Sequence, residues 1–330
     1  MSIKRISAIC VYFLTKKLQK DVSGIKKDLA GVRIDIKRLD PKVDVVFKQI
    51  FGAEKNKTIL ISFLNAVFAL PEENQITALE ILNPYLEQEH IDDSYGILDI
   101  KIQLGSGDMV DVEVQIGDRA NMERRSTYYI CRMFGDQKII KGRYQNLKRT
   151  VAINILDFVR IKDSRCYHTT FRLLELEEKI ELTDAIEIHF IELPKLSEEM
   201  ANHADPLDRW VMFLKGWDDM ELLKRLSEED PAIARAKQTL EEMAADPRAK
   251  EIYELRLKAI LDRNSDLYEA EMKGEMKGKL EGKLEGKQEA ARNALKKGLL
   301  LEDIAEITGL SLETVQKLKA ELSCARHLRN

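Results

Sequence analysis

The clearest pattern in the chain is an alternation of apolar and polar residues in two neighbouring segments. Residues 97–104 and 110–116 alternate with a period of two, which is typical of β-strands that have one apolar and one polar face. The loop 105–108 between them, Gly-Ser-Gly-Asp, has the composition of a hairpin turn. The polar positions of the predicted hairpin are Asp99, Lys101, Gln103, Asp111, Glu113 and Gln115. We therefore expect these side chains to gather on one face.

The remaining elements follow from apolar spacing and from turn residues. A turn at residues 39–42 precedes a short helix that ends at Gly52. Further helices are predicted at about 57–68 and 120–137, and strands at about 78–82, 151–158, 166–174 and 186–193. From Ser197 onward the composition is helical, with breaks near Pro206, Pro231 and Pro247. The order predicts an α/β core followed by an α-helical C-terminal region.

The C-terminal region contains the one internal repeat that we find in the sequence. Glu-Met-Lys-Gly occurs twice and Lys-Leu-Glu-Gly then occurs twice, which places glycines at 274, 278, 282 and 286. Each glycine costs a helix about 1 kcal/mol relative to alanine. Two interpretations stay open: the glycines allow close packing against a partner helix, or the segment is a flexible charged linker.

The last part of the chain has the pattern of a helix-turn-helix. Residues 301–308 and 312–318 have helical apolar spacing, with Gly309 as the turn and Ser311 as an N-cap. The second helix offers Glu313, Thr314, Gln316 and Lys317 to a partner. One cation among these four makes it a weak candidate for DNA contact.

These patterns divide the chain into five segments. A basic extension (1–38) is followed by an α/β core (39–196), a helical region (197–270), the glycine-punctuated segment (271–297) and the helix-turn-helix-like tail (298–330). No apolar run approaches the length of a membrane span, and no cleavage site follows the apolar run 6–14, so a signal peptide is rejected. Four cysteines without metal-ligand spacing favour free thiols in the cytoplasm.

The net charge of the whole chain does not indicate a nucleic-acid partner, but one segment is strongly basic. The 330 residues carry a net charge of −4, yet residues 119–149 hold nine Lys or Arg and two Asp or Glu. Such a basic segment can follow phosphates, and interleaved tyrosines can stack on bases. The alternative is a solvated basic helix without a partner. The candidate DNA-binding residues are Arg124, Arg125, Tyr129, Arg132, Lys141 and Arg143.

The polar face of the hairpin indicates metal chemistry. Carboxylates from both strands converge there, and like-charge repulsion makes this costly unless a cation lies between them. Hard oxygen ligands favour Mg²⁺ or Mn²⁺. Such an ion polarises a phosphodiester and lowers the pKa of an attacking water.

The ordered motifs of the chain resemble those of the PD-(D/E)XK nuclease superfamily, and within it the bacterial recombination-promoting nuclease and transposase family. The resemblance covers about residues 40–300 and implies a restriction-endonuclease-like αβββαβ core, a divalent metal and DNA cleavage. The motifs are Asp44-Val-Val-Phe-Lys-Gln-Ile-Phe-Gly52, Ile97-Leu-Asp99-Ile, Val112-Glu113-Val-Gln115, Met122-Glu-Arg-Arg125-Ser-Thr-Tyr128-Tyr129, Tyr144 and Ile191-Glu-Leu-Pro-Lys195.

The resemblance assigns roles to individual positions. Asp99 matches the first metal-binding acid and Glu113 the second, with the backbone carbonyl at 114 as a further ligand. Gln115 stands where the superfamily usually has the catalytic lysine, so the positive charge is missing there. Lys101, on the same face, is a candidate for the missing cation, and its alternative role is a counter-charge to the carboxylates. Asp44 is a candidate third acid or a helix N-cap.

Three functions are compatible with the sequence. The first is a metal-dependent DNA endonuclease connected with recombination or transposition. The second is a catalytically degenerate DNA-binding or assembly protein that keeps the fold, which Gln115 favours. The third is a regulator that binds DNA through the C-terminal helix-turn-helix. In each case we expect DNA as a partner, no membrane, and a homo-oligomer formed through the C-terminal helices.

Overall fold

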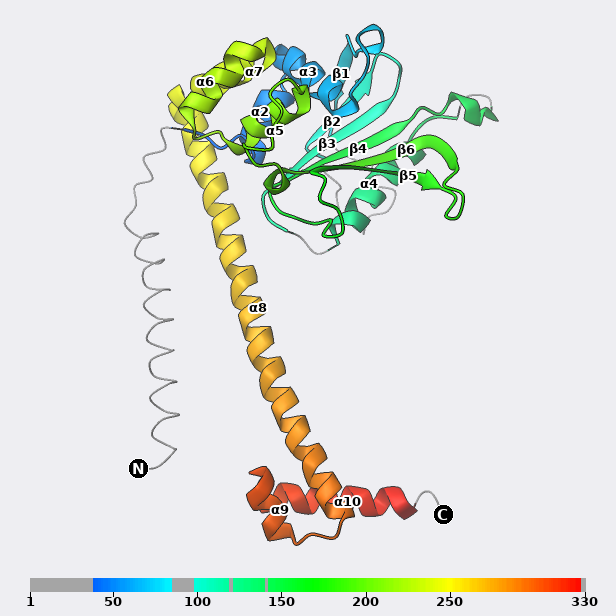
Figure 1. Cartoon of the computed structure of the whole chain (residues 1–330), viewed down its shortest axis with the longest axis vertical. Coiled ribbons are helices and arrows are strands. Elements are labelled where there is room, and N and C mark those ends of the chain that lie inside the picture. The colour runs from blue at the N-terminus through cyan, green and yellow to red at the C-terminus, as the bar shows by residue number, and fades with distance from the viewer. Residues whose placement is uncertain (1–37, 85–97, 119–120, 140–141, 328–330) are drawn as a thin grey trace. The chain divides into compact units, whose positions relative to one another are not determined.

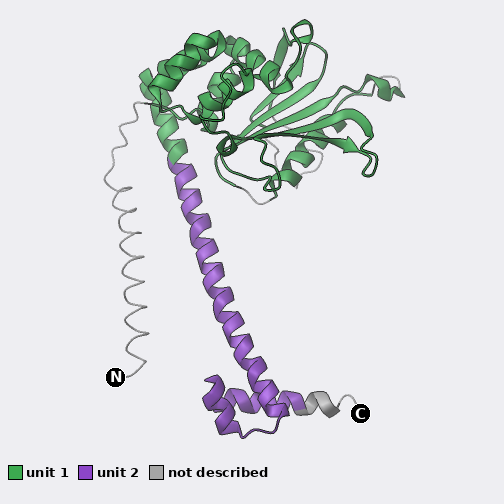
Figure 2. Ribbon diagram, viewed as in Figure 1, with its two compact units in different colours: residues 1–257 green, residues 258–330 purple. Residues whose placement is uncertain are grey.

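Figure 1 shows the computed structural model of the chain, which describes residues 38–84, 98–118, 121–139 and 142–327. The chain divides into two compact units, residues 1–257 and 258–330 (Figure 2). The predictions for residues 1–37, for Ile97 and for Lys141 lie outside the described residues.

The first unit is built around a mixed six-stranded sheet in the order β1-β2-β3-β4-β6-β5. Its strands are β1 (Leu79–Leu82), β2 (Ile100–Leu104), β3 (Met109–Gln115), β4 (Thr150–Leu156), β5 (His168–Leu174) and β6 (Glu181–Glu192). β1, β2 and β3 pair antiparallel, as expected for the hairpin. β4 then pairs parallel with both β3 and β6, and β5 pairs antiparallel with β6.

Helices surround this sheet in the order that the sequence predicts. The helices of the first unit are α2 (Asp44–Phe51), α3 (Lys57–Phe68), α4 (Met122–Gly135), α5 (Pro206–Lys215), α6 (Met220–Glu229) and α7 (Pro231–Ala245). The run from α3 through β1, β2, β3 and α4 to β4 is an αβββαβ core. The expected α/β fold with a helical C-terminal region is therefore confirmed.

The centre of the sheet is covered on both faces. All seven residues of β4 are buried, which a central strand requires. On one face Asn154 of β4 donates a hydrogen bond to the Ser126 hydroxyl of α4 (2.9 Å). On the other face the ring of Phe68, the last residue of α3, lies 5.6 Å from that of His189 in β6. The sheet is thus the middle layer of three.

Aromatic side chains form the core between the helices of the second face. Phe47 and Phe51 of α2, Phe63 of α3 and Trp210 of α5 are fully buried. Their ring centroids lie 4.7 to 6.0 Å apart, the range in which aromatic pairs stabilise one another. This cluster fixes α2 in position, and α2 carries a residue of the candidate site.

The polar side chains of β3 are buried, unlike those on an ordinary solvated strand face. Asp111, Glu113 and Gln115 are only 3%, 2% and 8% exposed. The reason is that α4, the crossover between the parallel strands β3 and β4, covers this face. Strand β2 begins at Ile100, so Asp99 precedes the strand instead of lying inside it.

The second unit contains most of a long helix and a small helical tail. Helix α8 (Pro247–Lys296) continues without a break through the glycine repeat, and α9 (Leu301–Thr308) and α10 (Leu312–His327) follow it. Gly309 adopts a positive φ of 63° between α9 and α10, and the Ser311 hydroxyl accepts from the backbone N–H of Thr314 (3.2 Å), as an N-cap does. Within the described residues, no helix is long and apolar enough to cross a bilayer.

Candidate functional site

The strand register places the two predicted acids side by side. Ile100 pairs with Val112 in the antiparallel ladder, so Asp99 and Glu113 are the next residues of the two strands. Oδ2 of Asp99 accepts a hydrogen bond from the backbone N–H of Val114 (3.2 Å). This bond fixes the Asp99 carboxylate against the end of β3.

A lysine that the sequence analysis did not select contacts the first acid. Nζ of Lys48 lies 3.1 Å from Oδ1 of Asp99. Lys48 belongs to α2, whose position is set by the buried aromatic cluster. Its spacing could have indicated the role, because Asp44 and Lys48 are four residues apart in the first motif and share one helix face.

An arginine of α4 contacts the second acid. A guanidinium nitrogen of Arg125 lies 2.5 Å from Oε2 of Glu113, and Nε2 of Gln115 lies 3.5 Å from the same oxygen. Burial alone would lower the pKa of Arg125, but the charge of Glu113 and the hydrogen bond to it, together with Tyr129 and Asp99, raise that pKa. Arg125, a candidate DNA-binding residue, is therefore also a partner of the buried acid, and it lies 5.5 Å from the centre of the Tyr129 ring.

A third carboxylate, Asp111, lies on the same face as Glu113. Burial raises its pKa well above the usual aspartate range, and the neighbouring charges of Glu113 and Asp99 raise it further. Lys101 pairs with Asp111 in the strand register, and its charge opposes that shift. Within the described residues, Oδ1 of Asp111 has no hydrogen-bond partner. A raised pKa favours the protonated, neutral form of Asp111, which lessens the repulsion among the three acids beside Lys48 and Arg125.

The residues present fit a divalent cation by donor chemistry. Asp99 and Glu113 offer carboxylate oxygens from adjacent strand ends, and Oδ1 of Asp111, which has no hydrogen-bond partner among the described residues, is a further buried oxygen beside them. Hard oxygens suit Mg²⁺ or Mn²⁺. No group of three or more Asp, Glu, His or Cys side chains among the described residues is arranged to hold a metal. Two side chains, with a backbone carbonyl, are thus the ligand set to test.

Asp44 has a partner that the sequence did not predict. It is the first residue of α2, and both of its carboxylate oxygens contact the guanidinium of Arg256 (2.6 and 2.7 Å). The N-cap interpretation is wrong, because Val43 occupies that position and no side chain caps the helix. The role of Asp44 as a third acid stays a prediction.

The predicted DNA-binding residues lie in different environments. Arg124 and Arg143 are exposed, whereas Tyr129 and Arg132 are half-buried. Tyr129 packs on the buried pair Leu98 and Met133, so its ring is partly a structural element. Tyr128 and Tyr144 of this basic segment are exposed as well.

A cavity of about 550 Å³ begins at Lys48 and extends between α2, α7 and the start of α8. Its cationic lining residues are Lys48, Lys55 and Arg248, beside apolar walls from Val45, Met243 and Ile252. Because Lys48 also contacts Asp99, this cavity adjoins the acidic strand ends.

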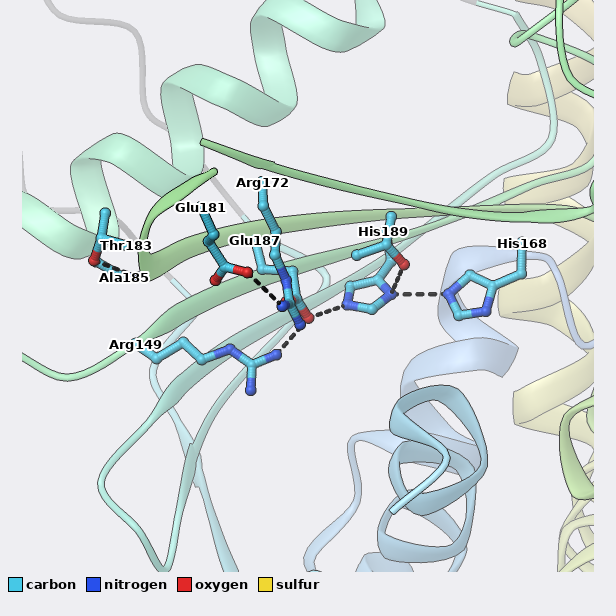
Figure 3. A network of polar contacts seen from close by, with 9 residues as sticks. Arg149, His168, Arg172, Glu181, Thr183, Ala185, Glu187 and His189 are labelled. Carbon is cyan, nitrogen blue, oxygen red and sulfur yellow. Dashed lines mark hydrogen bonds and ion pairs between the residues drawn. The ribbon is translucent and has the colours of Figure 1, made fainter. Parts of the chain in front are cut away.

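A second polar cluster lies on the opposite face of the sheet (Figure 3). Glu187 of β6 is buried, and it accepts from Arg149, Arg172 and His189. His189 Nδ1 lies 2.8 Å from His168 Nε2. With Glu187 accepting the hydrogen bond of His189 Nε2–H, Nδ1 of the neutral His189 ring is an acceptor and Nε2 of His168 is its donor.

Burial and hydrogen bonding set the charges of this cluster. Burial opposes ionisation of Glu187, but the hydrogen bonds from His189 and Arg172 and the charges of Arg149 and His189 together lower its pKa to about 2. Burial lowers the pKa of His168 to about 4, and His189 adds to this effect. At neutral pH the carboxylate is charged and His168 is neutral. Glu187 and the two histidines satisfy one another, which indicates a structural role, although Nε of Arg149 has no hydrogen-bond partner among the described residues.

Comparison with known proteins gives one match. Residues 41–270 match the family model described as PD-(D/E)XK nuclease family transposase. No curated protein and no solved structure matches the chain. The matched range includes every described residue of the carboxylate site.

Proposed function

The chain belongs to the PD-(D/E)XK nuclease family of transposases, and we propose that it is a divalent-metal-dependent endodeoxyribonuclease that hydrolyses phosphodiester bonds. The observation that carries the proposal is the pair of carboxylates, Asp99 and Glu113, at adjacent strand ends with cations of two helices beside them. Nucleases of this family generally use divalent metals. Mg²⁺, or Mn²⁺ in its place, is the ion that we propose.

Each residue of the site then has a chemical task. Asp99 and Glu113 would hold the ion, which would polarise the phosphodiester and acidify an attacking water. Gln115 can orient that water through hydrogen bonds but cannot supply charge. Lys48, already 3.1 Å from Asp99, is placed to stabilise the negative charge that develops on the phosphate. Lys101 is the second candidate for this task, on the same strand face.

The substrate proposal rests on charge around the site. The basic segment 119–149 carries a net charge of +7, and its helix α4 supplies Arg125 to Glu113. Exposed cations such as Arg124 and Arg143 can follow the phosphates of DNA. The cavity next to Lys48 adds little to this charge, because Glu242 and Asp246 line it beside Lys55 and Arg248.

The test is cleavage of plasmid DNA by the full-length protein in the presence of Mg²⁺ or Mn²⁺. We expect Asp99→Asn and Glu113→Gln to lower the rate about 10²-fold or more, because a Lewis acid is worth several kcal/mol at the transition state. Glu80→Gln, which alters an exposed acid of β1, is the matched control and should cleave at the parental rate. Equal cleavage by all four proteins would contradict the assignment of the site.

A second candidate function is a DNA-binding or assembly protein without catalysis. It is favoured by Gln115 in place of lysine and by the pairing of both acids with protein cations. DNA binding without cleavage in either metal would support this alternative. Metal-dependent cleavage that is lost with Asp99→Asn would exclude it.

The cellular setting follows from the family. We propose a role in recombination or transposition, in the cytoplasm, by a homo-oligomer that forms through the C-terminal helices. Two exposed free thiols, Cys131 and Cys166, agree with a reducing compartment. Exposed apolar residues along α8 support the homo-oligomer.

A further inference from the structure

Helix α8 carries an apolar ridge without a partner in the described part of the chain. Met272, Met276, Leu280 and Leu284 are 42%, 72%, 70% and 48% exposed. They are four residues apart, so they form one row along the helix. The four glycines lie two residues away from them, about 200° around the helix, and a Cβ at any of these glycines would meet nothing within 4 Å. The apolar ridge, and not the glycine row, is the surface that needs a partner.

The charges beside the ridge reverse at its midpoint. In residues 271–278 a Glu precedes each Met and a Lys follows it, whereas in 279–286 a Lys precedes each Leu and a Glu follows it. The residue before and the residue after an apolar side chain lie on opposite flanks of the ridge. Each flank therefore changes sign between residues 278 and 279.

Stability of the single helix does not account for this arrangement. The reversal does give two favourable pairs, Lys279 with Glu275 (2.5 Å) and Lys277 with Glu281 (3.8 Å). Within each half, however, like charges stand four residues apart, which destabilises an isolated helix. These like pairs are Glu271 with Glu275, Lys273 with Lys277, Lys279 with Lys283, and Glu281 with Glu285. A helix selected for its own stability would alternate the sign at every repeat.

Symmetry distinguishes the ways in which two such helices can pair. Each helix has a leading flank, formed by the residues before the apolar side chains, and a trailing flank, formed by the residues after them. In a parallel pair the leading flank of one helix faces the trailing flank of the other, so four copies of Glu-Met-Lys-Gly would already be complementary in charge. In an antiparallel pair a twofold axis places like flanks together. There an unbroken repeat would place Glu against Glu, and only a reversal at the midpoint makes the flanks complementary.

We propose that residues 271–286 of α8 bind the same segment of a second copy of the chain, antiparallel and centred on Gly278. Met272 then packs beside Leu284 of the second copy, and Met276 beside Leu280. The charged contacts are Glu271 with Lys283, Glu275 with Lys279, Lys273 with Glu285, and Lys277 with Glu281, each formed twice by symmetry. Rows of every fourth residue interlock when helices cross at about −50°, which confines the contact to about two repeats on each side of the centre.

The proposal specifies the homo-oligomer of the proposed function and rests on that part of it, but not on cleavage. Its complementarity is internal to the chain, since the flanks match themselves after a twofold rotation. For that reason a second copy, and not an unrelated helix, is the occupant that the charges select.

The test is a charge exchange on the full-length protein, with mass measured by sedimentation across concentration at low salt, where exposed charges act most strongly. One variant is Glu271→Lys with Glu275→Lys, and the other is Lys279→Glu with Lys283→Glu. Each double variant makes four contacts of the dimer repulsive, and we expect its dissociation constant to rise at least about tenfold. Circular dichroism checks that the helix persists.

Two further samples decide whether the helices pair parallel or antiparallel: a mixture of the two double variants, and a single chain that carries all four substitutions. The two double variants mixed together should form heterodimers, because one has only Lys and the other only Glu on the leading flank. All four substitutions in one chain should restore the wild-type dissociation constant to within about threefold. In a parallel pair the fourfold variant would be weaker than either double variant, which would overturn the proposal. A wild-type protein that stays monomeric, or dimers that none of the variants affects, would overturn it as well. Plasmid cleavage is measured separately, so loss of the dimer and loss of the nuclease are distinguishable.

Discussion

At the scale of single residues, the candidate site depends on which cation faces which acid. Lys48 contacts Asp99, Arg125 contacts Glu113, and Lys101 pairs with Asp111 in the strand register. Among the described residues, the side chain of Gln115 forms one weak hydrogen bond, at 3.5 Å to Glu113. The positive charge that Gln115 lacks is therefore available from α2 and from β2, at opposite edges of the acids.

Substitution of Lys48 tests which of these cations serves catalysis. Under the proposed function, we expect Lys48→Met to lower the cleavage rate about 10- to 100-fold, because a preorganised charge at the developing phosphate charge is lost. DNA affinity at fixed salt should change little, since a single phosphate contact contributes weakly. The measurement is the single-turnover rate at saturating Mg²⁺.

Two comparisons keep this prediction specific. Lys55→Met removes a lysine that lines the same cavity but does not contact Asp99, and it should cleave at nearly the parental rate. Lys101→Met is compared in parallel. A large loss with Lys101→Met and none with Lys48→Met would assign the cation to β2.

At the scale of elements, the sheet separates two polar networks with different tasks. The acids of β3 face α4, whereas Glu187 and His189 of β6 face α3. The second network joins Arg149, the residue before β4, and Arg172 and His168 of β5 to β6. Because its buried charges are compensated inside the sheet, its protonation should be linked to folding.

The linkage predicts a loss of stability in acid. The pKa of His168 is about 4 in the folded chain against 6.5 ordinarily, so the unfolded state binds more protons between these values. The free energy of unfolding should fall as the pH drops from 6.5 toward 4, by about 2 kcal/mol at pH 5 from this group. The pKa of Glu187, lowered from 4.5 to about 2, adds a second loss between those two values.

Urea unfolding at pH 7.5 and pH 5 checks the histidine. His168→Gln removes the titrating group, so this variant should lose about 2 kcal/mol less than the parent between the two pH values. The parent and the variant share every other titrating side chain, which makes the difference specific. Identical pH dependence in both proteins would show that His168 does not contribute.

At the scale of the whole molecule, the local concentration of basic residues lies in the segment 119–149 and not in the C-terminal tail. The basic segment 119–149 lies in the first unit with the acids, while residues 298–330 carry five acidic and four basic side chains. In α10, Lys317 is paired with Glu313 (3.0 Å). DNA contact is therefore expected from the first unit.

Deletion of residues 298–330 tests this division. We expect DNA affinity within about twofold of the full chain and an unchanged slope of affinity against salt, since that slope counts the phosphates contacted. Fluorescence anisotropy with a labelled duplex over a salt series provides both values. A reference variant, Arg124→Gln with Arg143→Gln, should weaken binding and lower the slope by about 2. A large loss on deletion would instead identify the helix-turn-helix as the main contact.

Local periodicity was sufficient to predict the elements. The alternation in 97–104 and 110–116 gives the β2–β3 hairpin, and the sequence order gives the αβββαβ core. Gly309 and Ser311 mark the turn between α9 and α10, because positive φ and capping depend on single residues. Strand-face alternation, also a local property, grouped Asp99, Asp111 and Glu113, and the resemblance to the nuclease family selected Asp99 and Glu113 among them.

The environment of those acids was decided by the tertiary structure alone. Lys48 meets Asp99 because aromatic packing positions α2, and Arg125 meets Glu113 because the crossover helix α4 covers the polar strand face. The pairing of Asp44 with Arg256 and the network around Glu187 likewise join residues that are distant in the sequence. The repeat of side-chain direction along a strand or helix tells which face a residue occupies. Only the packing of the layers determines what lies opposite that face.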